Sequence, residues 1–433
     1  MKSEIEHTST MLGSQNMKSS QRIVSVVEPY ELPEGWKWIS IGECCEKAFS
    51  GKSPKYSKEE TPYKIIGQQA NQRYGIDLKF VKFGTQEYAE AQADFYYLQY
   101  NDVILNTLGT GSIGRSGIYK YHEKILTDGH PFVFRTGTKY SPDLLFYYLR
   151  LNEQEIINTA NGSTNQKFLS LKTFSKFPIP LPPTLAEQQR IVNRIESMFA
   201  KLDEAKEKAQ NVVDGFETRK AAILHKAFTG ELTAKWRKEN GVSDDNWVEK
   251  RFDEVAEIKS NLVDVAEFQD FPHIAPDNIE KKTGVLLEYH TVAEDKVKSG
   301  KHRFYAGQIL YSKIRPYLSK VVVVDFDGVC SADMYPIEAK GNTRFLWYQM
   351  LSNEFLDKAS NSGSRSVLPK INQKELSVIP MQICSLPEQV EIVRILDIII
   401  EKENKAKQAA EAVLEQIDLL KKSILARAFR GEL

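Results

Sequence analysis

The sequence has few cysteines, no long apolar run and no excess of charge of either sign. Its 433 residues include four Cys, too few for a disulfide scaffold. The longest apolar runs, residues 321–324 and 398–400, are far shorter than the roughly 20 residues of a membrane-spanning helix. No apolar segment follows the N-terminus, so we expect no secretory signal, no membrane association and a cytoplasmic location.

Charge is balanced over the chain, with 58 Lys and Arg against 58 Asp and Glu. This balance argues against a polybasic protein that coats nucleic acid through its overall field, so any nucleic-acid contact must use local patches. Hydrophobic residues make up 41% and charged residues 27%, the composition of an ordinary globular protein. At ~150 residues per domain, the length predicts two to three domains.

Motifs for catalysis are absent as well. The sequence has no C-x-x-C or H-E-x-x-H, so we expect no metal site, and it has no N-P-P-[YF] or D-P-P-[YF] segment of the kind adenine methyltransferases use. Asp128–His130 is interpreted as a loop, because no nucleophile motif accompanies it. We therefore predict no catalytic residue in this chain.

One glycine-rich segment, Gly109–Ser116, nearly matches a phosphate-binding loop. Arg115 stands where that loop has lysine, and residues 117–121 are predicted to form a strand where a nucleotide site needs the start of a helix. We interpret the segment as a glycine loop beside a ligand surface. An enzyme that binds a nucleotide through it is one alternative.

What the sequence does contain is one internal repeat. Glu187-Gln188 recurs as Glu388-Gln389, 201 residues later, and Ala227–Leu232 recurs at the same offset as Ala428–Leu433, with one substitution. Weaker matches follow in the same order upstream. Each half is therefore predicted to consist of a variable domain followed by one long helix.

Each predicted long helix is marked at both ends. Thr184–Glu187 and Ser385–Glu388 match the capping box S/T-x-x-E, and Gly230 and Gly431 stand where C-caps belong. A 3,4 spacing of apolar residues runs on from each box in the same register, as in the seam of a coiled coil. The predicted seam contains Ile191, Ile195, Met198, Leu202, Val212, Phe216, Ile392, Leu396, Ile399, Val413, Ile417 and Leu420.

A long helix with one apolar stripe and charges on its other faces needs a partner. Two equivalent helices in one chain can pair with each other. We predict an antiparallel pair that holds one globular domain at each end. The alternative is two separate zippers, each formed between copies of the chain.

These signals predict an α+β architecture, in which two mixed α/β domains are separated by two long antiparallel coiled-coil helices and related by an internal pseudo-two-fold repeat. Short apolar runs bounded by Gly, Pro or Asp supply the expected strands. The predicted boundaries are a mobile tail over 1–30, a domain over 31–183, a helix over 184–230, a linker over 231–246, a second domain over 247–384 and a second helix over 385–433.

Polar, basic and aromatic residues gather in loops of both predicted domains. Asn and Gln pair with adenine and Arg with guanine, whereas Lys and Ser suit phosphate oxygens. Each loop alone is more consistent with an ordinary solvated loop, but their recurrence at similar places in both halves favours nucleic-acid contact. The candidate DNA-binding residues are Lys52, Lys55, Tyr56, Gln68, Gln69, Asn71, Arg73, Tyr74, Arg115, Asn165, Lys167, Lys313, Arg315, Tyr317, Lys320, Arg365 and Lys370.

Four strings in this layout resemble one known family. Leu32–Trp36 is similar to the start of its target-recognition domain, and Pro180–Gln188 is similar to the start of its central helix. Ile223–Arg237 and Ile424–Leu433 are similar to the ends of its helices. The chain thus resembles the specificity subunit of a type I DNA restriction–modification enzyme from about residue 30 onward.

The resemblance implies a non-catalytic subunit that binds double-stranded DNA, in which each target-recognition domain reads one half of a bipartite target. The paired helices would set the unspecified spacer between the half-sites and dock two methyltransferase subunits. Those subunits would carry S-adenosylmethionine for N6 methylation of flipped adenines, and two motor–nuclease subunits would use ATP and Mg. The chain itself would bind no cofactor. A coiled-coil scaffold or adaptor that binds other proteins is the alternative function.

Overall fold

The computed structural model describes residues 30–109, 111–162, 167–361 and 369–433. It consists of two compact units: unit 1 is Met1–Ala205 with Gln416–Leu433, and unit 2 is Lys206–Glu415. Each unit holds one globular domain, which we call domain 1 (residues 30–181) and domain 2 (residues 247–383). Residues 1–29 of the predicted tail and the candidates Asn165 and Arg365 lie outside the described residues.

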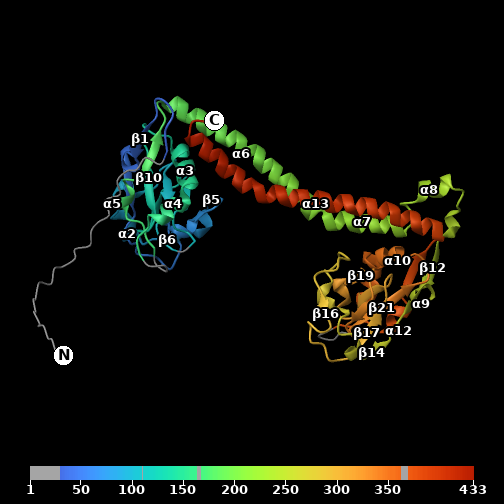
Figure 1. The fold of residues 1–433 in the computed structure, drawn as a ribbon. Helices are drawn as coiled ribbons and strands as arrows, with labels where there is room; N and C mark the ends of the chain where they lie inside the picture. Colours follow the sequence, from blue (N-terminus) through green and yellow to red (C-terminus); the bar gives the residue numbers. More distant parts are fainter. Residues whose placement is uncertain (1–29, 110, 163–166, 362–368) are drawn as a thin grey trace, which may run out of the picture. The chain divides into compact units, whose positions relative to one another are not determined.

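Domain 1 combines short strands with short helices (Figure 1). Its helices are α1 (Ile41–Cys44), α2 (Gln86–Glu90), α3 (Pro142–Leu151), α4 (Glu153–Asn158) and α5 (Leu171–Phe174). Its strands are β1 (Lys37–Ser40), β2 (Lys47–Ser50), β3 (Lys64–Ile66), β4 (Asn71–Gln72), β5 (Gly75–Ile76), β6 (Lys82–Phe83), β7 (Val103–Leu105), β8 (Ser116–Ile118), β9 (Ile125–Thr127), β10 (Phe132–Arg135) and β11 (Pro178–Leu181).

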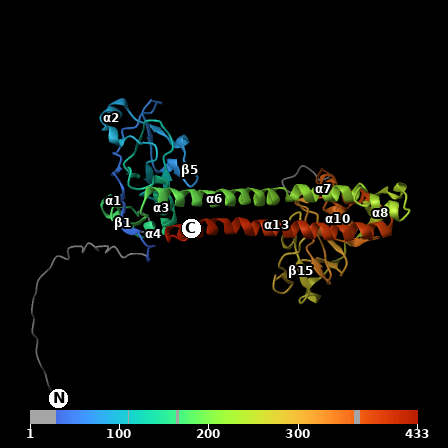
Figure 2. The same cartoon turned by 90° about the horizontal axis from the view of Figure 1, so that it is seen from above.

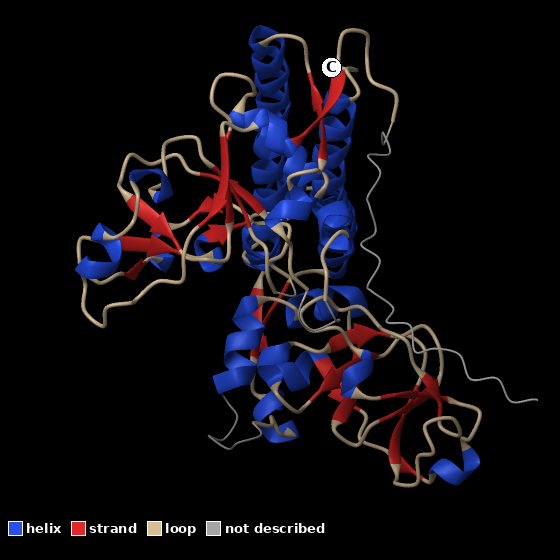
Figure 3. Cartoon of the chain, turned by 90° about the vertical axis from the view of Figure 1, so that its left-hand side faces the viewer, coloured by secondary structure: helices blue, strands red, loops and turns tan. Residues whose placement is uncertain are grey.

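Domain 2 has the same mixture of helices and strands (Figure 3). Its helices are α9 (Phe252–Val255), α10 (Thr343–Met350), α11 (Asn353–Asn361) and α12 (Gln373–Ser377). Its strands are β12 (Val248–Arg251), β13 (Ala256–Ile258), β14 (Leu262–Val263), β15 (Pro272–Ile274), β16 (His290–Thr291), β17 (Lys301–Phe304), β18 (Ile309–Ser312), β19 (Val321–Val323), β20 (Gly328–Cys330), β21 (Met334–Ala339) and β22 (Pro380–Ile383).

The same central sheet recurs in both domains. Its order is β2-β10-β7-β8 in domain 1 and β13-β21-β18-β19 in domain 2, with every neighbouring pair antiparallel. The inner strands β7 and β18 are buried along their whole length, as expected for largely apolar runs. Each domain adds a second sheet, β6-β3-β9 in domain 1 and β14-β17-β20-β15-β16 in domain 2.

A two-stranded ribbon closes each domain. The first and last strands of domain 1, β1 and β11, pair antiparallel, and β12 pairs with β22 in the same way in domain 2. Prolines at 178, 180 and 380 are tolerated because a two-stranded ribbon has free edges. Since β11 and β22 lead directly into long helices, the ribbons fix where each helix leaves its domain.

The long helices are α6 (Leu185–Asp214), α7 (Phe216–Phe228) and α13 (Leu386–Phe429). In unit 1, Arg190 donates to the carbonyl oxygen of Leu433, and Lys421 donates to Asp203, so α6 and α13 run antiparallel. In unit 2, Arg219 donates to Glu403 at 2.8 Å, and α7 runs antiparallel to α13 (Figure 2). No helix in the described residues is long and apolar enough to span a bilayer.

Two of the predicted seam residues are wrong. Val413 is 42% exposed and Leu420 is 47% exposed, while Leu414 and Lys421, one position further on, are half-buried. Lys421 also pairs with Asp203 of α6. A 3.6-residue helix drifts relative to a strict heptad, so the contact stripe shifts by one position along α13. Of the other predicted seam residues, Ile191, Ile195, Phe216, Ile392, Leu396 and Ile417 are buried, and Met198, Leu202, Val212 and Ile399 are half-buried.

The predicted single helix over 184–230 is divided at Gly215. Arg219 donates to the carbonyl oxygen of Val212 at 2.9 Å, so a side chain enters the hydrogen-bonding pattern of the last turn of α6. Such insertions interrupt a helix, and glycine tolerates the interruption.

The predicted linker over 231–246 is not a plain connection. It contains α8 (Ala234–Glu239), and Arg237 forms a buried ion pair with Glu388 of α13 at 2.7 Å. Glu388 is 0% exposed and also accepts hydrogen bonds from Thr233 and Trp247. Its predicted capping-box role is therefore wrong, because the backbone N–H of Ser385 donates to Asn246 instead. The sequence allows one or two extra helical turns through Trp236 in this polar linker, and α8 confirms them. Polar residues of the linker cover the start of α13.

Candidate nucleic-acid interface

Two of the predicted DNA-binding segments in domain 1 are bonded to each other. The side-chain oxygen of Gln68 accepts hydrogen bonds from the backbone N–H groups of Thr107 and Leu108, both at 2.8 Å. These bonds hold the segment around residue 68 against the loop that follows β7. Gln68 therefore positions the two loops through its side-chain oxygen.

Asn71 is a second side chain whose hydrogen bonds join the two loops. It is 1% exposed, and its amide donates to Asn106 Oδ1 and to the carbonyl oxygen of Arg115, both at 3.0 Å. A buried amide with such partners is part of the fold, because leaving those partners unpaired would cost free energy. The prediction that Asn71 contacts DNA is wrong.

Arg115 closes the glycine loop onto the same segment. Its guanidinium donates to the carbonyl oxygens of Asn71 at 3.2 Å and Gly111 at 2.8 Å, so this cation is also engaged internally. Gly109, Gly111 and Gly114 all have positive φ, which glycine adopts without strain. The loop leads into β8, not into a helix, so it lacks the helix N-terminus of a phosphate-binding loop.

The exposed residues next to Gln68 and Asn71 in the sequence are Gln69, Arg73 and Tyr74. Arg73 pairs with Glu153 through both terminal nitrogens, at 3.3 and 3.2 Å. Tyr74 is 75% exposed, and its hydroxyl donates to Asp77 at 2.8 Å. The pKa of Asp77 is lowered, first by the backbone N–H of Lys79 and then by the Tyr74 hydroxyl.

The loop around residues 51–56 packs against the turn at Asp128. A Cβ at Gly51 would lie 2.1 Å from the carbonyl oxygen of Thr127, so only glycine fits this approach. On this loop Lys52 lies 5.2 Å from the Tyr96 ring centre, and Lys55 pairs with Glu87 at 3.5 Å. Tyr56 is 42% exposed, and the amine of Lys82 lies 5.0 Å from its ring centre.

The sequence-based prediction missed two exposed residues that contact the loop after β7, which begins at residue 106. His130 is exposed, and its carbonyl oxygen accepts a hydrogen bond from the Thr107 hydroxyl. Phe168 is 45% exposed, forms a β-bridge with Leu108 and follows the half-buried candidate Lys167. An aromatic residue directly after a polar loop was the available signal for Phe168. His130 had no such signal, because only the fold brings its turn beside residue 107.

Domain 2 assembles equivalent segments. Ile314, after β18, forms a β-bridge with Lys370, just as Leu108, after β7, does with Phe168 in domain 1. The backbone N–H of Lys313 donates to the carbonyl oxygen of Asp333, which precedes β21, as His130 precedes β10. The same three segments therefore meet at the end of the central sheet in both domains.

Several predicted cations of domain 2 are used inside the fold. Lys313 donates to the carbonyl oxygen of Ala332 and Lys320 to that of Pro276, both at 2.6 Å. Their side chains are 24% and 15% exposed. Each amine thus joins two loops, which makes both lysines less accessible to a phosphate. Lys370 pairs with Asp333 at 3.2 Å and is more exposed.

Arg315 and Tyr317 are the accessible members of the domain 2 cluster. Arg315 is exposed, has a φ of 49° and makes no side-chain hydrogen bond or ion pair with the described residues. Tyr317 is 48% exposed in the turn that follows. An unpaired guanidinium suits phosphate or base contact, and a tyrosine lies two positions further along the chain. Among the described residues, no group of three His, Cys, Asp or Glu side chains is arranged to hold a metal ion.

The family model for the type I restriction modification DNA specificity domain matches residues 33–213 and again residues 244–416. The chain belongs to the type I restriction–modification specificity family. The EcoDI specificity subunit of Escherichia coli is 34% identical over 93% of this chain and 90% of its own length. The EcoBI specificity subunit of Escherichia coli is 25% identical over 66% of this chain and 65% of its own length.

Solved structures of specificity subunits share the fold. The HsdS subunit from Thermoanaerobacter tengcongensis has a TM-score of 0.65 at 18% identity, over 94% of this chain and 99% of its own. A chain from a structural study of complex assembly and conformational transition of the type I R-M system has a TM-score of 0.64 at 19% identity, over 94% of this chain and 100% of its own. Domains 1 and 2 of this specificity subunit are accordingly its two recognition domains.

Proposed function

We propose that each recognition domain reads one half of a bipartite sequence in double-stranded DNA. The observation that supports this is the repeated loop cluster. In both domains the segment after the inner strand bridges to the segment before a short helix, at Leu108–Phe168 and at Ile314–Lys370. Two equivalent clusters in one chain suit two separate half-sites, each read by its own loops.

The proposed DNA contacts fall into two groups, side chains that are exposed and side chains that are exposed but ion-paired. Arg315, Tyr317 and Gln69 are exposed and suit direct contact with bases or phosphates. Arg73 is paired on the surface, with its side chain 69% exposed. An exposed ion pair contributes little, about 0–1 kcal/mol, so exchanging a carboxylate for a phosphate costs little. Lys52, Lys55, Tyr56, Tyr74 and Lys370 belong to the same accessible group.

We also propose that the paired long helices set the spacer between the half-sites and bind two methyltransferase subunits. On α13, Leu419 is 69% exposed and Leu420 is 47% exposed although the helix is paired, which leaves apolar surface for a further protein. In this proposal the specificity subunit is non-catalytic. S-adenosylmethionine binds to the methyltransferase subunits, and ATP and Mg bind to two motor–nuclease subunits.

The experiment joins a pull-down to a DNA shift assay. The full chain is co-expressed with a methyltransferase subunit from a type I system, purified as a complex and titrated with target DNA and with DNA altered in either half-site. We expect co-purification and a shift that weakens when either half-site is altered, most clearly at raised salt, where non-specific binding falls. A complex that binds all three DNAs equally would instead favour a protein scaffold.

A further inference from the structure

The two recognition domains are joined to their long helices through equivalent residues. Gln188 Oε1 accepts from the backbone N–H of Ser141 at 2.7 Å, and Gln389 Oε1 accepts from that of Asn342 at 3.1 Å. Ser141 and Asn342 are the N-caps of α3 and α10. The residues immediately before these caps, at positions 140 and 341, are therefore equivalent in the two domains.

In domain 1 this position is Tyr140. Its side chain is fully buried, and its hydroxyl donates to the carbonyl oxygen of Pro180 at 3.0 Å. Cys44 and Leu144 belong to the same buried cluster. The ring thus fills the space between the start of α3, the end of α1 and the closing ribbon of domain 1.

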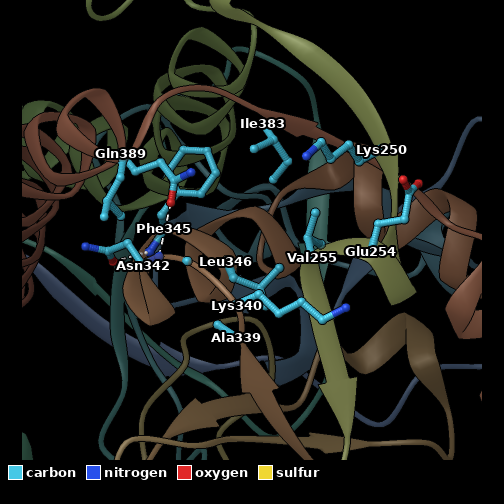
Figure 4. A pocket seen from close by; sticks show the side chains of 12 residues that line it. Lys250, Glu254, Val255, Ala339, Lys340, Asn342, Phe345, Leu346, Ile383 and Gln389 are labelled. Carbon is cyan, nitrogen blue, oxygen red and sulfur yellow. Dashed lines mark hydrogen bonds between the residues drawn. The ribbon is translucent and has the colours of Figure 1, made fainter.

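In domain 2 the equivalent residue is Gly341, and a cavity of about 230 Å³ lies beside it. The lining includes Val255 and Phe345, which are the counterparts of Cys44 and Leu144. Figure 4 shows the side chains of Phe345, Leu346, Val255 and Ile383 around this space, with Gln389 bonded to Asn342 at one side. The cavity opens to solvent beside the exposed Gly341, and its lining is part apolar and part polar. Its volume exceeds the roughly 150 Å³ of an enclosed apolar cavity that binds benzene, so a phenol ring fits by volume.

The rim of this cavity is mainly basic. Lys250 and Lys340 both line it and are exposed, and Glu254 is the acidic residue among the described lining residues. Lys340 donates to the carbonyl oxygen of Asp253, and Glu254 accepts from the backbone N–H of Arg251. Lys250 makes no hydrogen bond or ion pair with the described residues. An acidic group beside an aromatic ring would therefore be attracted to this opening.

We propose that this cavity is a docking site for a tyrosine or phenylalanine side chain, flanked by a carboxylate, on a partner protein subunit. The chain's own Tyr140 shows which side chain fits such a space. Because domain 1 fills its site internally, the docking site exists in domain 2 only. The proposal rests on the proposed function in one respect, which is that the partner is a methyltransferase subunit of the complex.

The first test uses small probes on the full chain. N-acetyl-Asp-Tyr-amide is titrated and followed by NMR, with N-acetyl-Lys-Tyr-amide as the charge-reversed probe. We expect one saturable site that binds the acidic probe more tightly. Gly341→Tyr should weaken binding by about tenfold or more, since its ring fills the cavity as Tyr140 does. Gly341→Ala is the matched control, because it adds a Cβ and no ring.

Gly341→Tyr is compatible with the backbone. Gly341 is not among the residues with positive φ. An added Cβ would lie 2.9 Å from Gln389 Oε1, so this hydrogen-bonded amide must shift slightly, and Gly341→Ala makes the same demand. Thermal unfolding of both variants checks that domain 2 stays folded. Absence of saturable binding to the unmodified chain, or equal binding to Gly341→Tyr, would overturn the site.

The second test measures assembly with methyltransferase subunits. Gly341→Tyr should lower the affinity for one of the two copies by about tenfold and leave the other unchanged. Unchanged affinity for both copies would overturn the assignment of the partner. Sequence-specific DNA binding is measured separately, in the shift assay with the methyltransferase subunit at saturating concentration. Under those conditions the Gly341→Tyr complex should still distinguish the target from DNA altered in either half-site. Loss of sequence preference in the unmodified complex would count against the proposed function instead.

Discussion

Gln188 accepts a hydrogen bond from the backbone N–H of Ser141 at 2.7 Å, and this bond joins a long helix to the start of a helix in a recognition domain. Gln188 is 1% exposed, so the bond is shielded from water. Gln389 and Asn342 repeat the same arrangement in the other half. Since the pair recurs at equivalent positions, its role is to hold each recognition domain in one orientation on its helix.

Replacing Gln188 by leucine removes the acceptor and leaves the buried N–H of Ser141 without a partner. We expect Gln188→Leu to lower the free energy of unfolding of unit 1 by about 1–3 kcal/mol, measured by urea denaturation. Gln189→Leu changes the neighbouring exposed position and should alter it by less than about 0.5 kcal/mol. Equal effects of the two substitutions would show that the Gln188–Ser141 bond does not stabilise the domain.

Glu388, which pairs with Arg237, and Glu187 occupy equivalent positions in the internal repeat, so their contributions to stability can be compared directly. Glu388→Ala leaves Asp244 as the carboxylate partner of Arg237 and removes the acceptor of Thr233 and Trp247. It should cost about 1–3 kcal/mol in the unfolding of unit 2. Glu187→Ala is the equivalent change in the other half, where the side chain is 28% exposed and pairs with Arg190. It should cost less than about 1 kcal/mol. Similar costs at both positions, measured by thermal unfolding, would contradict this asymmetry.

Asn71 is expected to act on DNA binding through the loops that it holds. Asn71→Ala leaves Asn106 Oδ1 without its donor and removes one of the two hydrogen bonds to the carbonyl oxygen of Arg115. It should destabilise unit 1 by about 1–3 kcal/mol. It should also weaken binding to one half-site without changing which bases are preferred there. Gln69→Ala, two residues away and exposed, should leave the unfolding temperature unchanged. If Asn71→Ala altered base preference at normal stability, the residue would be a base contact after all.

The long helices and the repeat could be predicted because their signals are local. Capping residues, apolar spacing and the offset of 201 residues are all visible in the chain itself. The seam was wrong at Val413 and Leu420 because the sequence does not say on which side of the stripe the partner helix lies. A shift of one position there reflects the drift between 3.6 and 3.5 residues per turn.

The DNA-binding residues were harder to predict, for a physical reason. Amides and amines bind backbone groups with the same atoms that they offer to DNA, so Asn71 and Lys320 have the composition of contacts but serve the fold. Only the tertiary structure separates them from Arg315 and Tyr317, which stay accessible. His130 was missed because its turn reaches the cluster through a contact between distant segments.

Arg315 is expected to contribute directly to DNA binding by domain 2. Arg315→Ala should weaken binding by about 1–3 kcal/mol and leave the unfolding temperature unchanged, because the side chain has no partner in the described fold. Lys320→Met is the contrasting variant: it removes a buried amine from the Pro276 carbonyl and should lower the unfolding temperature. Shift assays with DNA altered in each half-site measure the first effect. Unaltered binding by Arg315→Ala would remove it from the interface.

The most direct test of separate reading is to exchange residues 31–183 for the equivalent domain of another type I specificity subunit. The sequence methylated by the complete modification complex is then determined genome-wide. The account predicts that one half-site changes to that of the donor, while the other half-site stays the same. A change in both half-sites, or in neither, would contradict the claim that each recognition domain reads its own half of the target.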